Sequence, residues 1–162
     1  MSLRIIATGG TFDKHYNPLD GALAFGESVL PEALARARLT ESFTFEPLMA
    51  MDSLDMQDIH RQQILAACKG APEGRIVIVH GTDTLCETAA VIASAQLAKT
   101  IVLTGAMVPY DIVGSDAMFN LGSAITASRL SSHGVWIAMH AQLFAWKEVR
   151  KNRALGFFER AD

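Results

Sequence analysis

Hydroxyl, carboxylate and phenol side chains follow predicted strands at several points of this sequence. They are Thr8, Thr11, Tyr16, Asp52, Ser53, Thr82, Asp83 and Thr104. A hydroxyl group is a weak nucleophile at neutral pH and needs a base or a cation to activate it. Asp83, beside Thr82, can orient such a base, and Lys151 is a candidate for the base itself. The set indicates nucleophilic or general acid–base chemistry, and it identifies no substrate.

The loop from His80 to Asp83 lies between a predicted strand and a predicted helix. Residues 76–79 form a short apolar run of β-branched side chains, which is typical of a strand buried on both faces of a parallel sheet. Thr84 and Glu87 have the spacing of a capping box and predict the start of a helix. Because ligands of open α/β sheets bind at such strand ends, we expect functional residues in this loop.

The same alternation of strand and helix patterns runs through the whole chain. Strands are predicted at 4–8, 43–49, 76–79, 100–104 and 135–139, and helices at 29–39, 55–69, 87–98 and 116–131. Asp55 is the expected N-cap of the second helix. Residues 12–23 and 106–115 are rich in Gly, Pro, Asn and Asp and are predicted to be loops. We therefore expect residues 1–162 to form a single α/β domain with three layers (α/β/α) and a mostly parallel sheet.

Composition excludes several classes of protein. Half of the 162 residues are apolar and 19% are charged, which is typical of a globular domain. A net charge of -3 with no basic run argues against nucleic acid as a partner, and no apolar stretch reaches the ~20 residues that span a membrane. Two cysteines form no disulfide framework, so a cytoplasmic location is expected. The five histidines share no ligand spacing, so we expect no metal and no cofactor.

Each candidate residue also has an ordinary structural interpretation. Gly9-Gly10 can serve a tight turn alone, and it lacks the spacing of a dinucleotide fingerprint. Asp83 can bond to the local backbone of its loop. His80, at a strand end, is more typical of a structural histidine than of a general base. A lone tyrosine or lysine, such as Tyr16 or Lys151, is usually a surface residue.

Two motifs resemble the signatures of the N-terminal domain of bacterial-type L-asparaginases. Thr8-Gly9-Gly10-Thr11 is similar to the first signature, and His80-Gly81-Thr82-Asp83-Thr84-Leu85 is similar to the second. Weaker similarities follow in the family's order at 52–56, 103–107 and 115–121. The resemblance implies a flavodoxin-like fold and hydrolysis of L-asparagine to L-aspartate and ammonia through a threonine acyl-enzyme.

The resemblance also implies the role of each site residue. It implies catalytic roles for Thr11, Tyr16, Thr82, Asp83 and Lys151, and substrate-binding roles for Gly10, Asp52, Ser53, Gly81 and Ala106. Thr11 corresponds to the usual nucleophile, and Tyr16 corresponds to the tyrosine of a lid. We expect residues 12–25 to form that lid and to become ordered when a ligand binds. Lys151 corresponds to the catalytic lysine through the weak context Glu148-Val149-Arg150-Lys151.

Two alternatives to an asparaginase remain open. One is a glutaminase or another side-chain amidase, because a single methylene gives a selectivity of only ~1–3 kcal/mol. The other is a non-catalytic module that binds an amino acid and retains the site.

The resemblance covers the N-terminal domain only. The usual family member has a second domain that supplies an acidic residue to a neighbouring active site, and this sequence ends at Asp162 without it. We therefore expect a homo-oligomer, a dimer or a tetramer, in which an apolar surface near the C-terminus is covered. That surface is expected to contain Phe144, Trp146, Phe157 and Phe158.

Overall fold

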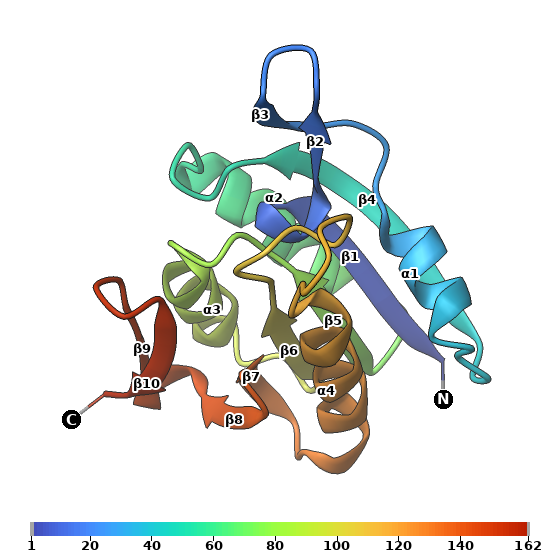
Figure 1. Cartoon of the computed structure of the whole chain (residues 1–162). Helices are drawn as coiled ribbons and strands as arrows, with labels where there is room; N and C mark the ends of the chain where they lie inside the picture. The colour runs from blue at the N-terminus through green and yellow to red at the C-terminus, as the bar shows by residue number, and fades with distance from the viewer. Residues whose placement is uncertain (1, 162) are drawn as a thin grey trace.

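A six-stranded sheet forms the centre of the computed structural model, which describes residues 2–161 (Figure 1). In spatial order its strands are β4 (Phe43–Met51), β1 (Leu3–Gly9), β5 (Arg75–Val79), β6 (Thr100–Thr104), β7 (Gly134–Met139) and β8 (Gln142–Ala145). Neighbouring strands are parallel except β7 and β8. The prediction of a mostly parallel sheet is confirmed.

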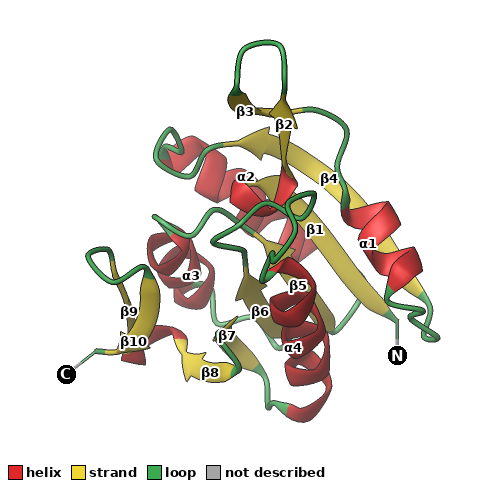
Figure 2. Ribbon diagram, viewed as in Figure 1, coloured by secondary structure: helices red, strands yellow, loops and turns green. Residues whose placement is uncertain are grey.

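Helices cover both faces of this sheet (Figure 2). They are α1 (Leu30–Arg36) and α4 (Ala117–Leu130) on one face, and α2 (Asp58–Gly70) and α3 (Leu85–Ser94) on the other. In β5, Val77 and Val79 pack toward α1 and α4, whereas Ile76 and Ile78 pack toward α2 and α3. A strand that is apolar on both faces is therefore required here, and the three-layer prediction is confirmed.

Among residues 2–161, no helix has the length and apolar character to cross a membrane.

Two short hairpins lie outside the main sheet. One pairs β2 (Lys14–Asn17) with β3 (Ala22–Phe25), and the other pairs β9 (Val149–Asn152) with β10 (Phe157–Arg160). Single 3-10 turns, η1 (Thr11–Asp13) and η2 (Trp146–Glu148), precede them.

The prediction of a loop over 12–23 is wrong for the strand residues of the first hairpin. Asn17 and Asp20, which suggested a loop, instead accept the backbone N–H groups of Leu19 and Ala22 and shape the turn. Turn residues therefore end two strands here and do not mark one long loop.

Both predicted N-caps are wrong in their hydrogen bonds. Thr84 does precede α3, but its hydroxyl donates to the carbonyl oxygen of Ser53 at 2.8 Å and makes no capping bond. Helix α2 begins after Gln57 and not after Asp55, because the Gln57 N–H donates to Nδ1 of His60 at 3.0 Å. The Thr84 hydroxyl thus donates to a distant carbonyl oxygen and does not accept a backbone N–H of its own helix. A local stretch of sequence does not reveal this partner.

The expected C-terminal patch of aromatics is only partly present. Phe144 and Phe158 are buried at 3% and 1% exposure and pack into the core beneath α3. Trp146 and Phe157 remain exposed at 36% and 39%. The antiparallel pairings of β8 and of β10 fold the first two aromatics back onto the sheet, so this surface is smaller than predicted.

Candidate active site

The polar residues singled out in the sequence follow the carboxyl ends of neighbouring strands. Thr11 follows β1, Asp52 and Ser53 follow β4, and Thr82 and Asp83 follow β5. These three strands are neighbours in the order β4-β1-β5, and all run in the same direction. The loops therefore emerge side by side at one edge of the sheet, as parallel strands require.

Backbone contact between Gly10 and Gly81 joins the two glycine motifs. Gly10 has a φ of 76°, and a Cβ atom at this position would overlap the N and Cα atoms of Gly81. A side chain at Gly10 is excluded by both conformation and space. Thr11 and Thr82 each follow one of the two glycines directly, so the contact brings their loops together.

Ser53 lies on the other side of Gly81. A Cβ atom on Gly81 would lie 2.6 Å from Cβ and Oγ of Ser53, which is 1% exposed. The Ser53 hydroxyl also accepts the Thr84 N–H at 3.4 Å, and its carbonyl accepts the Thr84 hydroxyl. The loop after β4 is thus fixed against both ends of the loop after β5.

Lys151 joins Thr82 and Asp83 in one hydrogen-bonded cluster. Its Nζ donates to Oγ1 of Thr82 at 2.8 Å and to Oδ1 of Asp83 at 2.7 Å. The Lys151 side chain is 11% exposed and that of Asp83 is 31% exposed. A largely buried lysine therefore contacts both a hydroxyl and a carboxylate.

The hairpin of β9 and β10 positions this lysine. Lys151 is paired with Phe158, which is almost fully buried in the core cluster beneath α3. Val149 on the same hairpin is also buried there. Arg153, in the turn, adds a hydrogen bond of 3.1 Å from Nη2 to the carbonyl oxygen of Asp83. Hydrophobic anchoring thus fixes the distance of Lys151 from the loop after β5.

Thr11 and Tyr16 are placed differently from the lysine cluster. Within residues 2–161 the Thr11 side chain makes no hydrogen bond, so its hydroxyl is free to act on a ligand. Tyr16 is 56% exposed and lies on β2, opposite Leu23. Its hairpin projects away from the body of the molecule (Figure 1). The structure therefore does not bring Tyr16 into contact with the cluster of Thr82, Asp83 and Lys151.

Asp52 is held by Lys14, a residue that the sequence pattern did not single out. Lys14 Nζ donates to Oδ2 of Asp52 at 2.7 Å and lies 5.4 Å from the ring centre of Phe25. The hydrogen bond from Lys14, followed by the Leu54 N–H, lowers the pKa of Asp52. Asp52 is therefore charged, and the base of the first hairpin is tied to the loop that carries Ser53. Lys14 lies only three residues after Thr11, and that proximity was the one signal that could have found it.

His15 holds the other side of the same hairpin through contacts with Glu27 and Asp111. Its Nε2 lies 2.8 Å from the carbonyl oxygen of Glu27, and its Nδ1 contacts the carboxylate of Asp111. Both partners are acceptors, so His15 donates to both of them at once only in its protonated form. The bond to Glu27 raises the pKa of His15; burial lowers it less strongly, and Asp111 and Asp13 also raise it.

Three other candidate residues have structural roles. His80 is fully buried and bonded to Gly81 and Thr88, and burial lowers its pKa to about 4, so it is a neutral structural histidine. Thr8 and Thr104 donate to the carbonyl oxygens of Val79 and Ala138.

Ala106 has no side chain at the surface of the site. It is 1% exposed and packs in the core cluster with α1 and α4, so only its backbone is available to a ligand.

Across residues 2–161, no group of three His, Cys, Asp or Glu side chains is arranged to hold a metal ion.

The fold and the cluster define an α/β domain that carries threonine hydroxyls, a lysine and a carboxylate at the carboxyl edge of a parallel sheet. The chain belongs to the asparaginase family, since the family model described as "Asparaginase, N-terminal" matches residues 2–158. Membership supports amidohydrolase chemistry and does not define the substrate.

Individual relatives agree with this family. A Haemophilus influenzae protein named "Probable L-asparaginase periplasmic" is 30% identical over 93% of this chain and 46% of its own length. A Thermococcus kodakarensis protein, named as a subunit of glutamyl-tRNA(Gln) amidotransferase, is 30% identical over 87% of this chain and 34% of its own. The solved structure of the thermostable L-asparaginase from Thermococcus kodakarensis superposes with a TM-score of 0.88 at 27% identity, over 99% of this chain and 51% of that one. The chain thus spans about half the length of these asparaginases.

Proposed function

We propose that this chain hydrolyses the side-chain amide of L-asparagine to L-aspartate and ammonia, through an acyl-enzyme on Thr11. The observation that supports it best is the contact of Lys151 with both Thr82 and Asp83. A hydroxyl that is bonded to a lysine amine can exchange a proton with it without movement of heavy atoms. Thr11 adds a hydroxyl that has no hydrogen-bond partner among residues 2–161, one residue beyond the Gly10–Gly81 contact.

The reaction has two steps. In the first, Oγ1 of Thr11 attacks the amide carbon, and an ester bond forms as the carbon–nitrogen bond breaks. The hydroxyl proton passes through Thr82 and Lys151 to the leaving group, which departs as ammonia. In the second step a water molecule cleaves the ester and releases L-aspartate with the Thr11 hydroxyl restored. Backbone N–H groups of the glycine-containing loops, at Gly10 and Gly81, would stabilise the oxyanion.

The remaining residues are assigned to substrate binding. The ionised Asp52 suits an α-ammonium group, and the Ser53 hydroxyl suits an α-carboxylate. The backbone of Ala106 closes the same edge of the sheet. Tyr16 would reach Thr11 only when the first hairpin moves toward the site, so its catalytic role depends on closure of residues 12–25.

Glutamine is the second candidate substrate. A relative that matches 87% of this chain is named as part of an amidotransferase, and selectivity for one methylene is modest. A non-catalytic amino-acid-binding module would share the same residues.

Ammonia release from asparagine and glutamine, measured side by side with calorimetric binding of L-aspartate, separates these functions. We expect release with asparagine as the better substrate. Faster release from glutamine would reassign the substrate. Binding of aspartate without release from either amide would identify a binding module and contradict the proposal.

We also propose that the chain is cytoplasmic and folds as one domain over residues 1–162. The thiols of Cys68 and Cys86 are both free, and burial raises their pKa values to about 12 and 11. Unreactive free thiols suit a reducing compartment. Cell fractionation tests the location, and two-state unfolding of this chain tests the single domain.

A further inference from the structure

Asp116 stands at the N-cap position of α4, yet its side chain makes no capping hydrogen bond. An aspartate at this position normally accepts a backbone N–H of the first helical turn. Here both of its oxygens accept the N–H of Met107 at 3.0 Å, and Oδ1 also accepts the N–H of Val108 at 3.0 Å. The carboxylate therefore binds the loop after β6 and not the helix that it begins.

Asn120, one turn into α4, belongs to the same network and is fully buried. Its Nδ2 donates to the carbonyl oxygen of Gly105 at 3.0 Å and to Oδ2 of Asp116 at 2.9 Å. Its Oδ1 accepts the N–H of His140, in the turn after β7, at 3.1 Å. A buried polar network whose members all have partners fixes the geometry of the segments that it joins. The two side chains thus hold the loop on both sides of Ala106.

Gly105 brings this loop into contact with the candidate active site. A Cβ atom at Gly105 would lie 2.4 Å from the carbonyl oxygen of His80 and 3.2 Å from Cγ2 of Thr82. The methyl and hydroxyl groups of Thr82 share one carbon atom, so rotation about χ1 moves both together. The rotamer that packs the methyl group beside Gly105 also places Oγ1 2.8 Å from Nζ of Lys151. The position of the loop therefore limits the direction of the Thr82 hydroxyl.

We propose that Asp116 and Asn120 are positioning residues for the proposed reaction. They hold Gly105 against the methyl group of Thr82, and the Thr82 hydroxyl then keeps the orientation in which it meets Lys151. Neither side chain is hydrogen-bonded to Thr82 or Lys151, so both act through the loop. This role rests on the proposed function, because it affects the reaction only if Thr82 and Lys151 exchange a proton.

Asp116→Asn tests the role directly, because it replaces an accepting oxygen of the network by an N–H donor. We expect kcat for asparagine to fall by ~10²-fold, the cost of a displacement of about 1 Å in a catalytic group. Asp58→Asn is the matched control, since Asp58 lies in the first turn of α2 and its side chain is fully exposed. Its turnover should be native. Native kcat for Asp116→Asn would overturn the inference.

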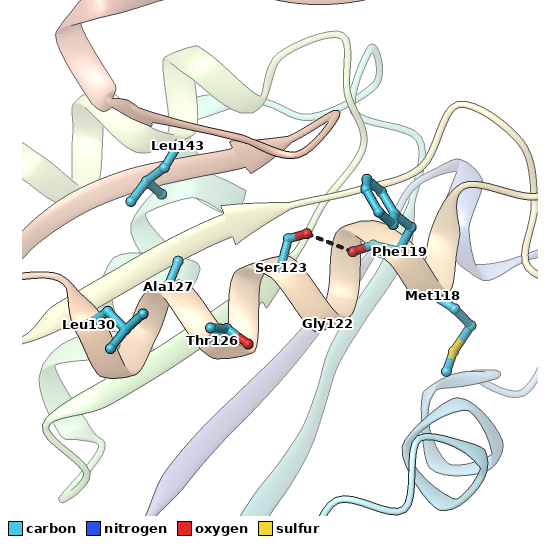
Figure 3. Close-up of a pocket in the computed structure, with 8 residues that line it drawn as sticks. All are labelled: Met118, Phe119, Gly122, Ser123, Thr126, Ala127, Leu130 and Leu143. Atoms are coloured by element: carbon cyan, nitrogen blue, oxygen red, sulfur yellow. Dashed lines mark hydrogen bonds between the residues drawn. The ribbon is translucent and has the colours of Figure 1, made fainter.

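Gly105→Ala displaces the loop by another route and serves if Asp116→Asn does not fold. The added methyl group has no room beside His80 and Thr82, so the loop must move away from the site. Gly122→Ala is the control, because Gly122 lies on the exposed face of α4 beside Ser123, where no atom is within 4 Å of an added Cβ (Figure 3). We expect lower kcat for Gly105→Ala and native kcat for Gly122→Ala. Equal turnover of the two variants would contradict the role of the loop.

Thr82→Ser separates a positioning role from a general effect on the fold. It keeps the hydroxyl group and removes the methyl group that packs beside Gly105. We expect Thr82→Ser to lower kcat, and Asp116→Asn to lower it little further in that variant, because both changes free the same hydroxyl. Residues that act independently have additive effects, so the same fold-loss in both backgrounds would exclude positioning of Thr82. Native turnover of Thr82→Ser would exclude it as well.

NMR couplings to the Thr82 methyl group measure its χ1 angle whether or not the chain is active. We expect one χ1 rotamer in the native chain and in Asp58→Asn, and an average over several rotamers in Asp116→Asn. A single unchanged rotamer in Asp116→Asn would overturn the inference. If this averaging is seen while the native chain releases no ammonia, the positioning of Thr82 is supported and the proposed function is contradicted.

Discussion

Nζ of Lys151 lies 2.8 Å from Oγ1 of Thr82, although 69 positions separate the two residues in the sequence. The contact depends on the hairpin of β9 and β10, whose Phe158 is buried beneath α3, and on the loop after β5. Two elements from distant parts of the chain thus form one hydroxyl–amine pair. That pair is the centre of the proposed chemistry.

Thr11→Ala should reduce ammonia release by several orders of magnitude, because it removes the hydroxyl that forms the ester. The fold should persist, since the Thr11 side chain makes no hydrogen bond within residues 2–161. Mass spectrometry of the native enzyme quenched during turnover should find an acyl adduct on the peptide that contains Thr11. An adduct on the Thr82 peptide would show that the nucleophile was assigned to the wrong threonine.

Lys14→Met should weaken binding of L-aspartate, because it removes the hydrogen bond that positions Asp52. Without Lys14 the pKa of Asp52 rises toward its ordinary value. The loop that carries Asp52 and Ser53 also loses its hydrogen bond to the first hairpin. The KM for asparagine should therefore rise more than kcat falls. Lys69→Met, at the exposed end of α2, is the control and should change neither. A loss of kcat alone would instead place Lys14 in the chemical step.

Residues 12–25 should gain protection from hydrogen exchange when L-aspartate binds. The hairpin projects from the body and carries the exposed Tyr16, while Lys14 and His15 fix only its base. Elements with few buried contacts open at low free energy and close over ligands. Protection confined to other segments would contradict both the lid and the catalytic role proposed for Tyr16.

The pKa of His15 should lie above the ordinary value of about 6.5, because both of its ring nitrogens face acceptors. A raised pKa means that the stabilising contribution is present below the unfolded value and is lost as the pH rises through the folded value. The hairpin should therefore loosen as the pH rises through the raised pKa of His15. An NMR titration of the His15 ring protons checks this. A His15 pKa at or below 6.5, or one unchanged by Asp111→Asn, would contradict the double hydrogen bond.

The sequence was sufficient for the layers and for most of the edge that carries the site. The runs at 76–79 and 100–104 are apolar on both faces, and the structure has helices on both sides of them. The positions of Thr11, Ser53 and Thr82 followed from the rule that parallel strands end at one edge. Lys151 was a candidate base by residue type, but its place beside Thr82 and Asp83 came from the resemblance, because nothing local connects β9 to β5.

Long-range hydrogen bonds account for what the sequence could not predict. The Thr84 hydroxyl could accept a backbone N–H in its capping box, yet it donates to the carbonyl oxygen of Ser53, 31 positions away. Lys14 pairs with Asp52 across 38 positions, and His15 with Asp111 across 96. Partners of this kind exist only after the sheet has formed.

Ammonia release by Lys151→Met, compared with Lys147→Met and the native chain, tests the central claim most directly. Lys147 is exposed and lies only four positions away, so it is matched in charge and in location. Loss of a general base typically costs ~10²–10⁴-fold in rate. We expect such a loss for Lys151→Met, native turnover for Lys147→Met, and similar melting temperatures for both. Equal activity of the two variants, or no ammonia from the native chain with either asparagine or glutamine, would contradict the account.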